Sequence, residues 1–184
     1  PNMVVISPCD PIEMEQATKA ILDYVGPVYM RTGRSNTQRI LDTEYKFEIG
    51  KGRILKDGED VTIVACGVEV SRALDAAEIL KNEGVSARVV NMSTIKPIDS
   101  ELLKKCAVET GAFVTAEDHN VIGGLGGAVA ESLAKNKPAP IEFIGVQDMF
   151  GESGEPDELA EKYGQTAKFI ASAARRVIER KAGN

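Results

Sequence analysis

Short apolar runs alternate with amphipathic segments along most of this sequence. The runs are rich in β-branched residues, and "VTIVAC" (61–66) is apolar almost throughout, as is typical of a strand that is covered on both faces. In the segment 69–83, apolar residues recur at helical spacing and charged residues occupy the opposite face. Strands that alternate with helices in this way predict an α/β fold, with a mostly parallel sheet and helices on both of its faces.

The same pattern places the other elements. We expect further strands at 86–92, 112–117 and 140–146. Four further helices are expected: one that Asp99 caps and that ends at Gly111, one over 124–136, one from Pro156 to Gly164 and one from about Thr166 onwards. Ahead of them, residues 52–66 predict a hairpin, because two strand-like runs flank "KDGED" with its Asp-Gly turn signal. The hairpin would give the sheet one antiparallel edge strand.

The first 34 residues predict a β-α-β arm. "MVVI" (3–6) and "PVYMR" (27–31) are the expected strands. A helix is expected between them for three reasons. Asp10 is a suitable N-cap, Pro11 suits the first helical position, and Glu13 stands three residues after the cap, as in a capping box.

The stretch after the arm carries many polar groups and no long apolar run, which is typical of a connection. We therefore divide the chain into an arm (1–34), a linker (35–51) and a domain (52–184). Two lone parallel strands leave their outer backbone groups unpaired. We expect the arm to be held by something outside its own unit, either the arm of a neighbouring chain or residues of the same protein that lie outside this sequence.

Charge and composition narrow the choice of partners. The 184 residues carry a net charge of −6, which argues against nucleic-acid binding, because that requires a surplus of Lys and Arg. No run of 18 apolar residues suggests a membrane span. Cys9, Cys66 and Cys106 are odd in number and widely spaced, so we expect free thiols in a reducing, cytoplasmic setting, with the last two in the core. Pro1 is no natural initiator, so either a longer chain was cut or a methionine is missing.

The segment "TAEDHNVIGGLGGAVAE" (115–131) carries a glycine cluster where a strand meets a helix. Such a junction can bind an anion through free backbone N–H groups and the helix dipole. The dinucleotide pattern fails, because Val129 stands where glycine or alanine is required, and no Gly-Lys-Ser/Thr follows as in a nucleotide-phosphate loop. We prefer the interpretation that these glycines let helix and strand approach closely, and phosphate binding is the alternative.

His119, the only histidine, lies in the same segment beside Glu117 and Asp118. One interpretation makes it a general base that one of these acids orients. The other makes it a hydrogen-bonded residue at the end of a strand. We prefer the second, because no serine or cysteine of this sequence stands in a nucleophile motif.

Arg31 is expected at the carboxyl end of the arm's last strand, where open α/β sheets place their ligand sites. A planar, permanently charged guanidinium suits phosphate recognition. The alternative, which the residues alone slightly favour, is an arginine in a surface ion pair.

Several stretches follow one another in a characteristic order: "PNMVVISPCDPIEMEQATKAI", "GPVYMRTGR", "DVTIVACGVEV", "VVNMSTIKPID" and "FVTAEDHNVIGGLGGAVAE". In this order they resemble the C-terminal part of the transketolase family of thiamine-diphosphate enzymes, and above all the separately encoded C-terminal subunit of split transketolases. Residues 1–34 resemble the last strand, helix and strand of the family's pyrimidine-binding domain, and residues 52–181 resemble its C-terminal domain.

The resemblance implies a reaction that moves a two-carbon ketol unit between sugar phosphates, with thiamine diphosphate and Mg²⁺ as cofactors of the complete enzyme. It implies that Arg31 contacts the substrate phosphate, and that Arg34 is a second candidate nearby. The family's catalytic, cofactor-binding and metal-binding residues do not fall within this sequence, and His119 does not align with its substrate-site histidines. The chain alone is therefore expected to be inactive, to bind no cofactor, and to need an N-terminal half or subunit in a homodimer or heterotetramer.

Two other interpretations stay open. The synthase of 1-deoxyxylulose 5-phosphate shares this domain, as do the β subunits of 2-oxoacid dehydrogenases, and the motifs do not exclude the synthase. The alternative from a different class is a stand-alone α/β module that binds an anionic metabolite at the glycine loop. The sequence upstream of Pro1 would separate the transketolase from the module.

Overall fold

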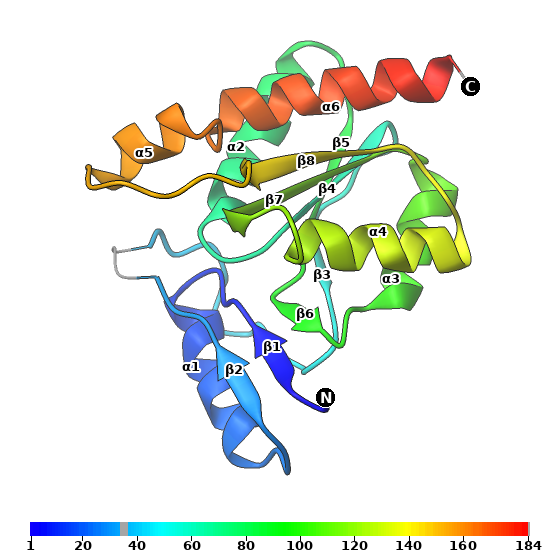
Figure 1. Cartoon of the computed structure of the whole chain (residues 1–184). Coiled ribbons are helices and arrows are strands. Elements are labelled where there is room, and N and C mark those ends of the chain that lie inside the picture. Colours follow the sequence, from blue (N-terminus) through cyan, green and yellow to red (C-terminus); the bar gives the residue numbers. More distant parts are fainter. Residues whose placement is uncertain (34–36, 184) are drawn as a thin grey trace.

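Two sheets form the framework of the chain (Figure 1). The computed structural model describes residues 1–33 and 37–183. The smaller sheet has the order β2-β1-β6, and the larger one has the order β3-β5-β4-β7-β8. The strands are β1 (Val4–Ile6), β2 (Val28–Met30), β3 (Arg53–Lys56), β4 (Val61–Ala65), β5 (Ala87–Asn91), β6 (Thr94–Lys96), β7 (Phe113–Asn120) and β8 (Ile141–Val146). The helices are α1 (Pro11–Leu22), α2 (Glu69–Asn82), α3 (Ser100–Glu109), α4 (Leu125–Asn136), α5 (Pro156–Lys162) and α6 (Ala167–Ala182).

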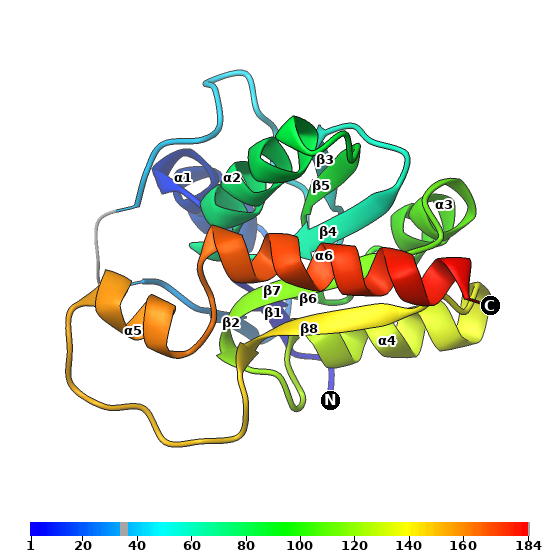
Figure 2. The same ribbon diagram turned by 90° about the horizontal axis from the view of Figure 1, so that it is seen from above.

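The larger sheet confirms the predicted α/β fold class. β5, β4, β7 and β8 run parallel, and β3 runs antiparallel to β5 at one edge. Helices α2 and α6 cover one face, and α3 and α4 cover the other (Figure 2).

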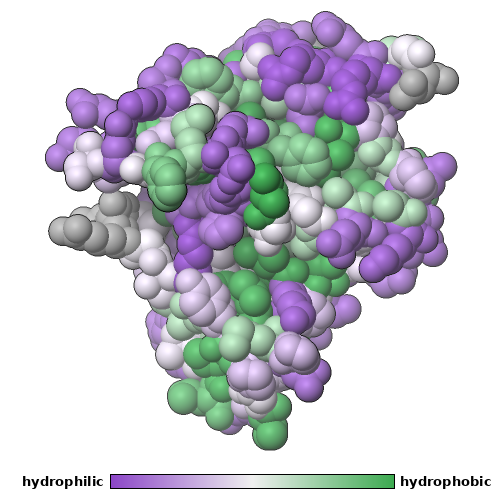
Figure 3. Space-filling view, viewed as in Figure 1, coloured by the Kyte–Doolittle hydropathy of each residue, from purple (hydrophilic) through white to green (hydrophobic). Residues whose placement is uncertain are grey.

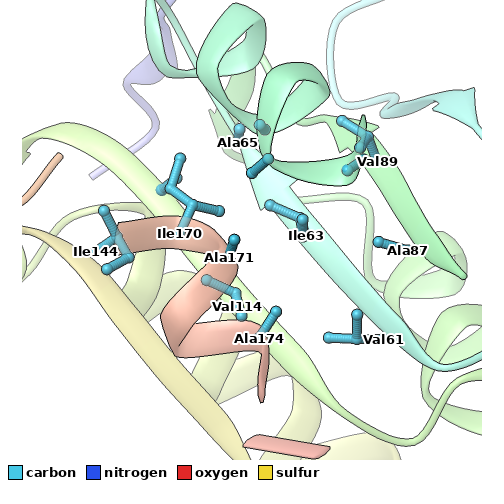
Figure 4. Packing of buried hydrophobic residues seen from close by; sticks show 14 of the residues in the cluster. Val61, Ile63, Ala65, Ala87, Val89, Val114, Ile144, Ile170, Ala171 and Ala174 are labelled. Carbon is cyan, nitrogen blue, oxygen red and sulfur yellow. The ribbon is translucent and has the colours of Figure 1, made fainter. Parts of the chain in front are cut away.

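Side chains along β4 alternate between these two layers. Ile63 packs in the cluster beneath α2 and α6, where Ile170 and Ala174 of α6 point toward the sheet (Figure 4). Cys66, just after β4, packs in the opposite cluster with Cys106 of α3. Both thiols are fully buried, and burial raises the pKa of each, so the prediction that they are core residues is confirmed.

The predicted hairpin at 52–66 is wrong. β3 and β4 are not neighbours, because β5 lies between them and pairs with both. The turn at Gly58 does form, but it carries the chain across the start of β5, where Glu59 N donates to Ser86 O. Glycine is required in this turn, because a Cβ would lie 2.3 Å from the carbonyl carbon of Ala87. The turn signal therefore predicts an antiparallel edge strand correctly, but not its partner.

The smaller sheet joins the arm to the rest of the chain. β1 pairs in parallel with β2, with Val4 opposite Val28, and in an irregular antiparallel ladder with β6. The sequence pattern does not predict β6, because this short strand follows closely on β5. The expectation that something outside this sequence holds the arm is wrong for β1, since β6 covers that edge. Figure 3 shows apolar side chains at the tip of the arm, where Leu22 and Val25 are largely exposed.

The segment predicted as a linker packs against the arm. Leu41 and Tyr45 are buried, and the N–H groups of Ile40 and Leu41 donate to Asp10 Oδ2 at 2.9 and 2.8 Å. Asp10 is the N-cap of α1, as predicted, because its Oδ1 accepts from Glu13 N at 2.8 Å. The division into arm, linker and domain stays a prediction.

Candidate functional site

Arg31 lies where the arm meets the larger sheet. It follows β2, and its main-chain N–H donates to Ile6 O at 2.8 Å, so the smaller sheet fixes its backbone. Its Nη2 lies 2.8 Å from Asp118 Oδ2 and also donates to Asp118 O. Because Asp118 belongs to β7, this ion pair joins the two sheets. Arg34, the second predicted phosphate contact, lies outside the described residues.

A cavity of about 220 Å³ opens beside this pair. Arg31 and Asp118 line it together with Ser7, Gly67 and Val68, which follow the carboxyl ends of β1 and β4. A second cavity, of about 410 Å³, shares Val68 and Asp118 with the first. The carboxyl ends of the parallel strands therefore surround a concave site, as expected for an open α/β sheet.

A buried acid lies next to these cavities at the start of α2. Glu69 is fully buried and pairs through Oε1 with Arg72, which lines the second cavity. Its Oε2 has no hydrogen-bond partner among the described residues. Burial outweighs the attraction of Arg72 and raises the pKa of Glu69 to about 7. The sequence does not reveal this acid, because the burial of a charged residue leaves no mark in the spacing of apolar positions.

The glycine cluster does not present a free helix terminus. Glu117 is buried, and its two carboxylate oxygens accept from Leu125 N at 2.7 Å and Gly126 N at 2.8 Å, the first N–H groups of α4. A Cβ at Gly124 would lie 2.0 Å from Glu117 Oε2. The protein's own carboxylate thus takes the place that an anion would need, which supports the packing interpretation of these glycines.

His119 lies at the edge of this arrangement. Its side chain is 49% exposed, and Nδ1 lies 4.0 Å from Glu117 Oε2. The nearest hydrogen bond joins Nδ1 to Asn120 O at 2.8 Å. These contacts support the interpretation of His119 as a hydrogen-bonded residue at a strand end.

Glu13 has a larger role than a capping box indicates. Its side chain is fully buried, and it accepts from Cys9 N at 2.8 Å, Tyr45 OH at 2.6 Å, Asn91 Nδ2 at 2.8 Å and Ser93 Oγ at 2.7 Å. Burial and the charge of Glu13 raise the pKa of Tyr45, which keeps its phenol a donor. One carboxylate therefore connects the arm, the segment after it and the end of β5.

The described residues do not fit the Mg²⁺ that the resemblance implies for the complete enzyme. A Mg²⁺ site needs several oxygen ligands around one point. Within residues 1–33 and 37–183, no three His, Cys, Asp or Glu side chains gather in a group that can hold a metal ion.

No helix within residues 1–33 and 37–183 is both long enough and apolar enough to cross a membrane.

Comparison with known proteins decides the family. The family model described as "Transketolase, C-terminal domain" matches residues 50–170, which include β3 to β8 and the helices between them. The chain belongs to the transketolase family.

The relatives of this transketolase-family chain include separately encoded subunits. A protein of Methanocaldococcus jannaschii, named provisionally as a transketolase C-terminal section, is 50% identical over 182 residues, which cover 97% of this chain and 56% of that protein. The 6-deoxy-6-sulfo-D-fructose transketolase subunit of Clostridium sp. (strain MSTE9) is 48% identical over 181 residues, which cover 98% and 56%. The chain thus spans about half the length of these relatives.

A solved structure and a second branch of relatives complete the comparison. The structure described as "Split gene transketolase, inactive beta4 tetramer" is 48% identical with a TM-score of 0.96, over 98% of this chain and 59% of that one. The 1-deoxy-D-xylulose-5-phosphate synthase of Heliobacterium modesticaldum is 38% identical over 182 residues, which cover 97% of this chain but 28% of the synthase. The predicted resemblance to the transketolase family is confirmed.

Proposed function

We propose that this chain is the C-terminal part of a transketolase-type enzyme that moves a two-carbon ketol unit between sugar phosphates, and that Arg31 binds the substrate phosphate. The position of Arg31 carries this proposal. It stands at the carboxyl end of a strand, beside a cavity, where the family resemblance expects a phosphate-binding arginine. Its Nε and Nη1 have no hydrogen-bond partner among the described residues, so they are available to an oxyanion.

The name of the Clostridium relative supports an anionic substrate. 6-Deoxy-6-sulfo-D-fructose carries a sulfonate, which, like a phosphate, offers several charged acceptor oxygens. A guanidinium suits both groups. Sugar phosphates remain the proposed substrate class, and Arg34, which lies outside the described residues, remains a second proposed contact.

The proposed enzyme is completed by an N-terminal half or subunit that supplies thiamine diphosphate, Mg²⁺ and the residues that bind them. We expect a homodimer or a heterotetramer. Three buried cysteines without a disulfide fit a reducing compartment, so a cytoplasmic location belongs to the same proposal.

Arg31→Ala in the complete enzyme should raise KM for phosphorylated sugars about 10- to 100-fold, because a charge-assisted hydrogen bond to the substrate is worth roughly 1.5–3 kcal/mol. Steady-state kinetics on phosphorylated and unphosphorylated sugars measure this, and the unphosphorylated substrates should be little affected. Arg175→Ala is a matched control, because Arg175 also pairs with a carboxylate, Glu83, at 2.6 Å, but on the exposed side of α2 and α6. Equal losses on both substrate types would show that Arg31 is structural.

The chain alone should show no saturable binding of thiamine diphosphate with Mg²⁺ in a calorimetric titration, because its described residues offer no metal-binding group. Binding should return when the N-terminal partner is added. Saturable, micromolar binding to this chain alone would contradict the proposal that the N-terminal half or subunit binds the cofactor.

The synthase branch is the second candidate function, because relatives in that branch also match nearly the whole chain. Their lower identity, 38% against 48–50%, favours transketolase. Formation of 1-deoxy-D-xylulose 5-phosphate by the complete enzyme, in place of ketol transfer between sugars, would reverse this preference.

A further inference from the structure

Among the described residues, the guanidinium of Arg31 is held by Asp118 of the larger sheet. Arg31 Nη2 lies 2.8 Å from Asp118 Oδ2 and also donates to the main-chain O of Asp118. The side chains of the pair are 26% and 30% exposed, so the contact lies at the surface of the cavity and not in the core. A long side chain with several rotatable bonds has many conformations, and two acceptors on one nitrogen select one of them.

The backbone next to Asp118 is anchored through its neighbour Glu117. It follows Glu117, whose carboxylate is bonded to the start of α4 and whose main-chain O accepts from Gln165 Nε2 at 3.1 Å. On the other side stands Gly67, where a Cβ would lie 3.4 Å from Asp118 Oδ1 and 2.8 Å from Ser7 Oγ. The position of Asp118 on β7 therefore determines where the guanidinium of Arg31 lies.

The pair leaves one side of the guanidinium available. Nη2 donates to Asp118, whereas Nε and Nη1 have no hydrogen-bond partner within the described part of the chain. Most residues that line the cavity beside them are uncharged, such as Ser7, Gly67 and Val68. Its two acids are engaged, because Asp118 pairs with Arg31 and Asp10 accepts from backbone N–H groups. An oxyanion that enters this cavity meets donors that are already oriented, and orientation before binding strengthens recognition.

From this geometry we infer that Asp118 is a positioning residue: it orients Arg31 toward the anionic group of the substrate without touching the substrate. This inference rests on the proposed function of Arg31. It gives the larger sheet a part in substrate recognition, although the arginine itself belongs to the arm.

Asp118→Asn in the complete enzyme tests the inference, because it removes the charge and keeps the shape. KM for a phosphorylated sugar should rise about 3- to 10-fold, a smaller change than for Arg31→Ala, while kcat and the KM of unphosphorylated sugars stay unchanged. Inorganic phosphate should inhibit the variant more weakly by a similar factor. Asp118→Glu, which keeps the charge, should restore part of the loss. Glu83→Gln, which takes the carboxylate from Arg175, is the matched control and should change none of these values.

The double variant Arg31→Ala/Asp118→Asn separates the inference from the function on which it rests. If Asp118 acts through Arg31, the second substitution adds no further rise in KM to the first. If Arg31→Ala has no effect on phosphorylated substrates, the proposed function of Arg31 is wrong. If Arg31→Ala has its effect but Asp118→Asn has none, adds to it in full, or lowers KM, Asp118 is not a positioning residue. An Asp118→Asn variant that does not assemble, while Asp118→Glu assembles with wild-type KM for phosphate sugars, also overturns the inference, because the role is then structural.

Discussion

Replacing Glu13 with alanine is expected to lower the free energy of unfolding by about 4 kcal/mol, among the largest effects of any single substitution. The carboxylate is fully buried and accepts four hydrogen bonds, from the backbone of Cys9 and the side chains of Tyr45, Asn91 and Ser93. Without it, four buried donors lose their acceptor, and each such loss costs roughly 1–3 kcal/mol unless water or a rearrangement replaces the bond.

Chemical denaturation and thermal unfolding both measure this effect. For a chain of this size, the midpoint temperature of thermal unfolding should fall by roughly 10 °C. Glu15→Ala is the matched control on the same helix, because Glu15 is exposed and, among the described residues, pairs with Lys19, so its loss should leave the stability nearly unchanged. Glu13→Gln should lie between the two, because an amide keeps one acceptor oxygen. Equal stability of the two alanine variants would show that the Glu13 network does not hold the arm.

Gly124→Ala is expected to destabilise the chain by about 3 kcal/mol, through overpacking and the loss of a helix cap. The new Cβ would lie 2.0 Å from Glu117 Oε2, 2.7 Å from its Cδ and 2.9 Å from Asn120 O. The carboxylate has to move away, and the N–H groups of Leu125 and Gly126 then lose their acceptor.

Gly127→Ala provides the control within the same glycine cluster. A Cβ at this position meets no atom within 4 Å, and α4 continues through it. Alanine is favoured over glycine inside a helix by roughly 0.5–1 kcal/mol, so this variant should be as stable as the wild type or slightly more stable. Thermal unfolding of both variants compares them directly. If Gly127→Ala is as damaging as Gly124→Ala, the close approach of Glu117 is not the reason that glycine is needed.

Features decided within one helical turn could be predicted from the sequence. Asp10 and Asp99 cap α1 and α3 as expected, and each accepts from the residue three positions later, Glu13 N and Leu102 N. The alternation of strands and helices likewise predicted the α/β fold, because the spacing of apolar residues within each element indicates its type and its buried face.

Features that depend on distant parts of the chain could not be predicted. The turn at Gly58 was evident from the sequence. It does not indicate which strand β3 pairs with, and in the structure β5 lies between β3 and β4. Arg31 emerged as a candidate from its place at a strand end and from the family resemblance. Its partner Asp118 lies 87 residues away, and spacing alone gives no sign of such a contact.

The outer edge of β2 has a consequence for how the protein is made. No strand pairs with this edge within residues 1–33 and 37–183. Tyr29 of β2 is exposed, and so are Leu22 and Val25 at the neighbouring tip. An open strand edge beside apolar side chains can pair with a strand of another protein or with a strand of a second copy of this chain. Under the proposed division into two subunits, the N-terminal subunit has to be made in matching amounts to cover this edge. An excess of this chain alone favours contacts between identical copies.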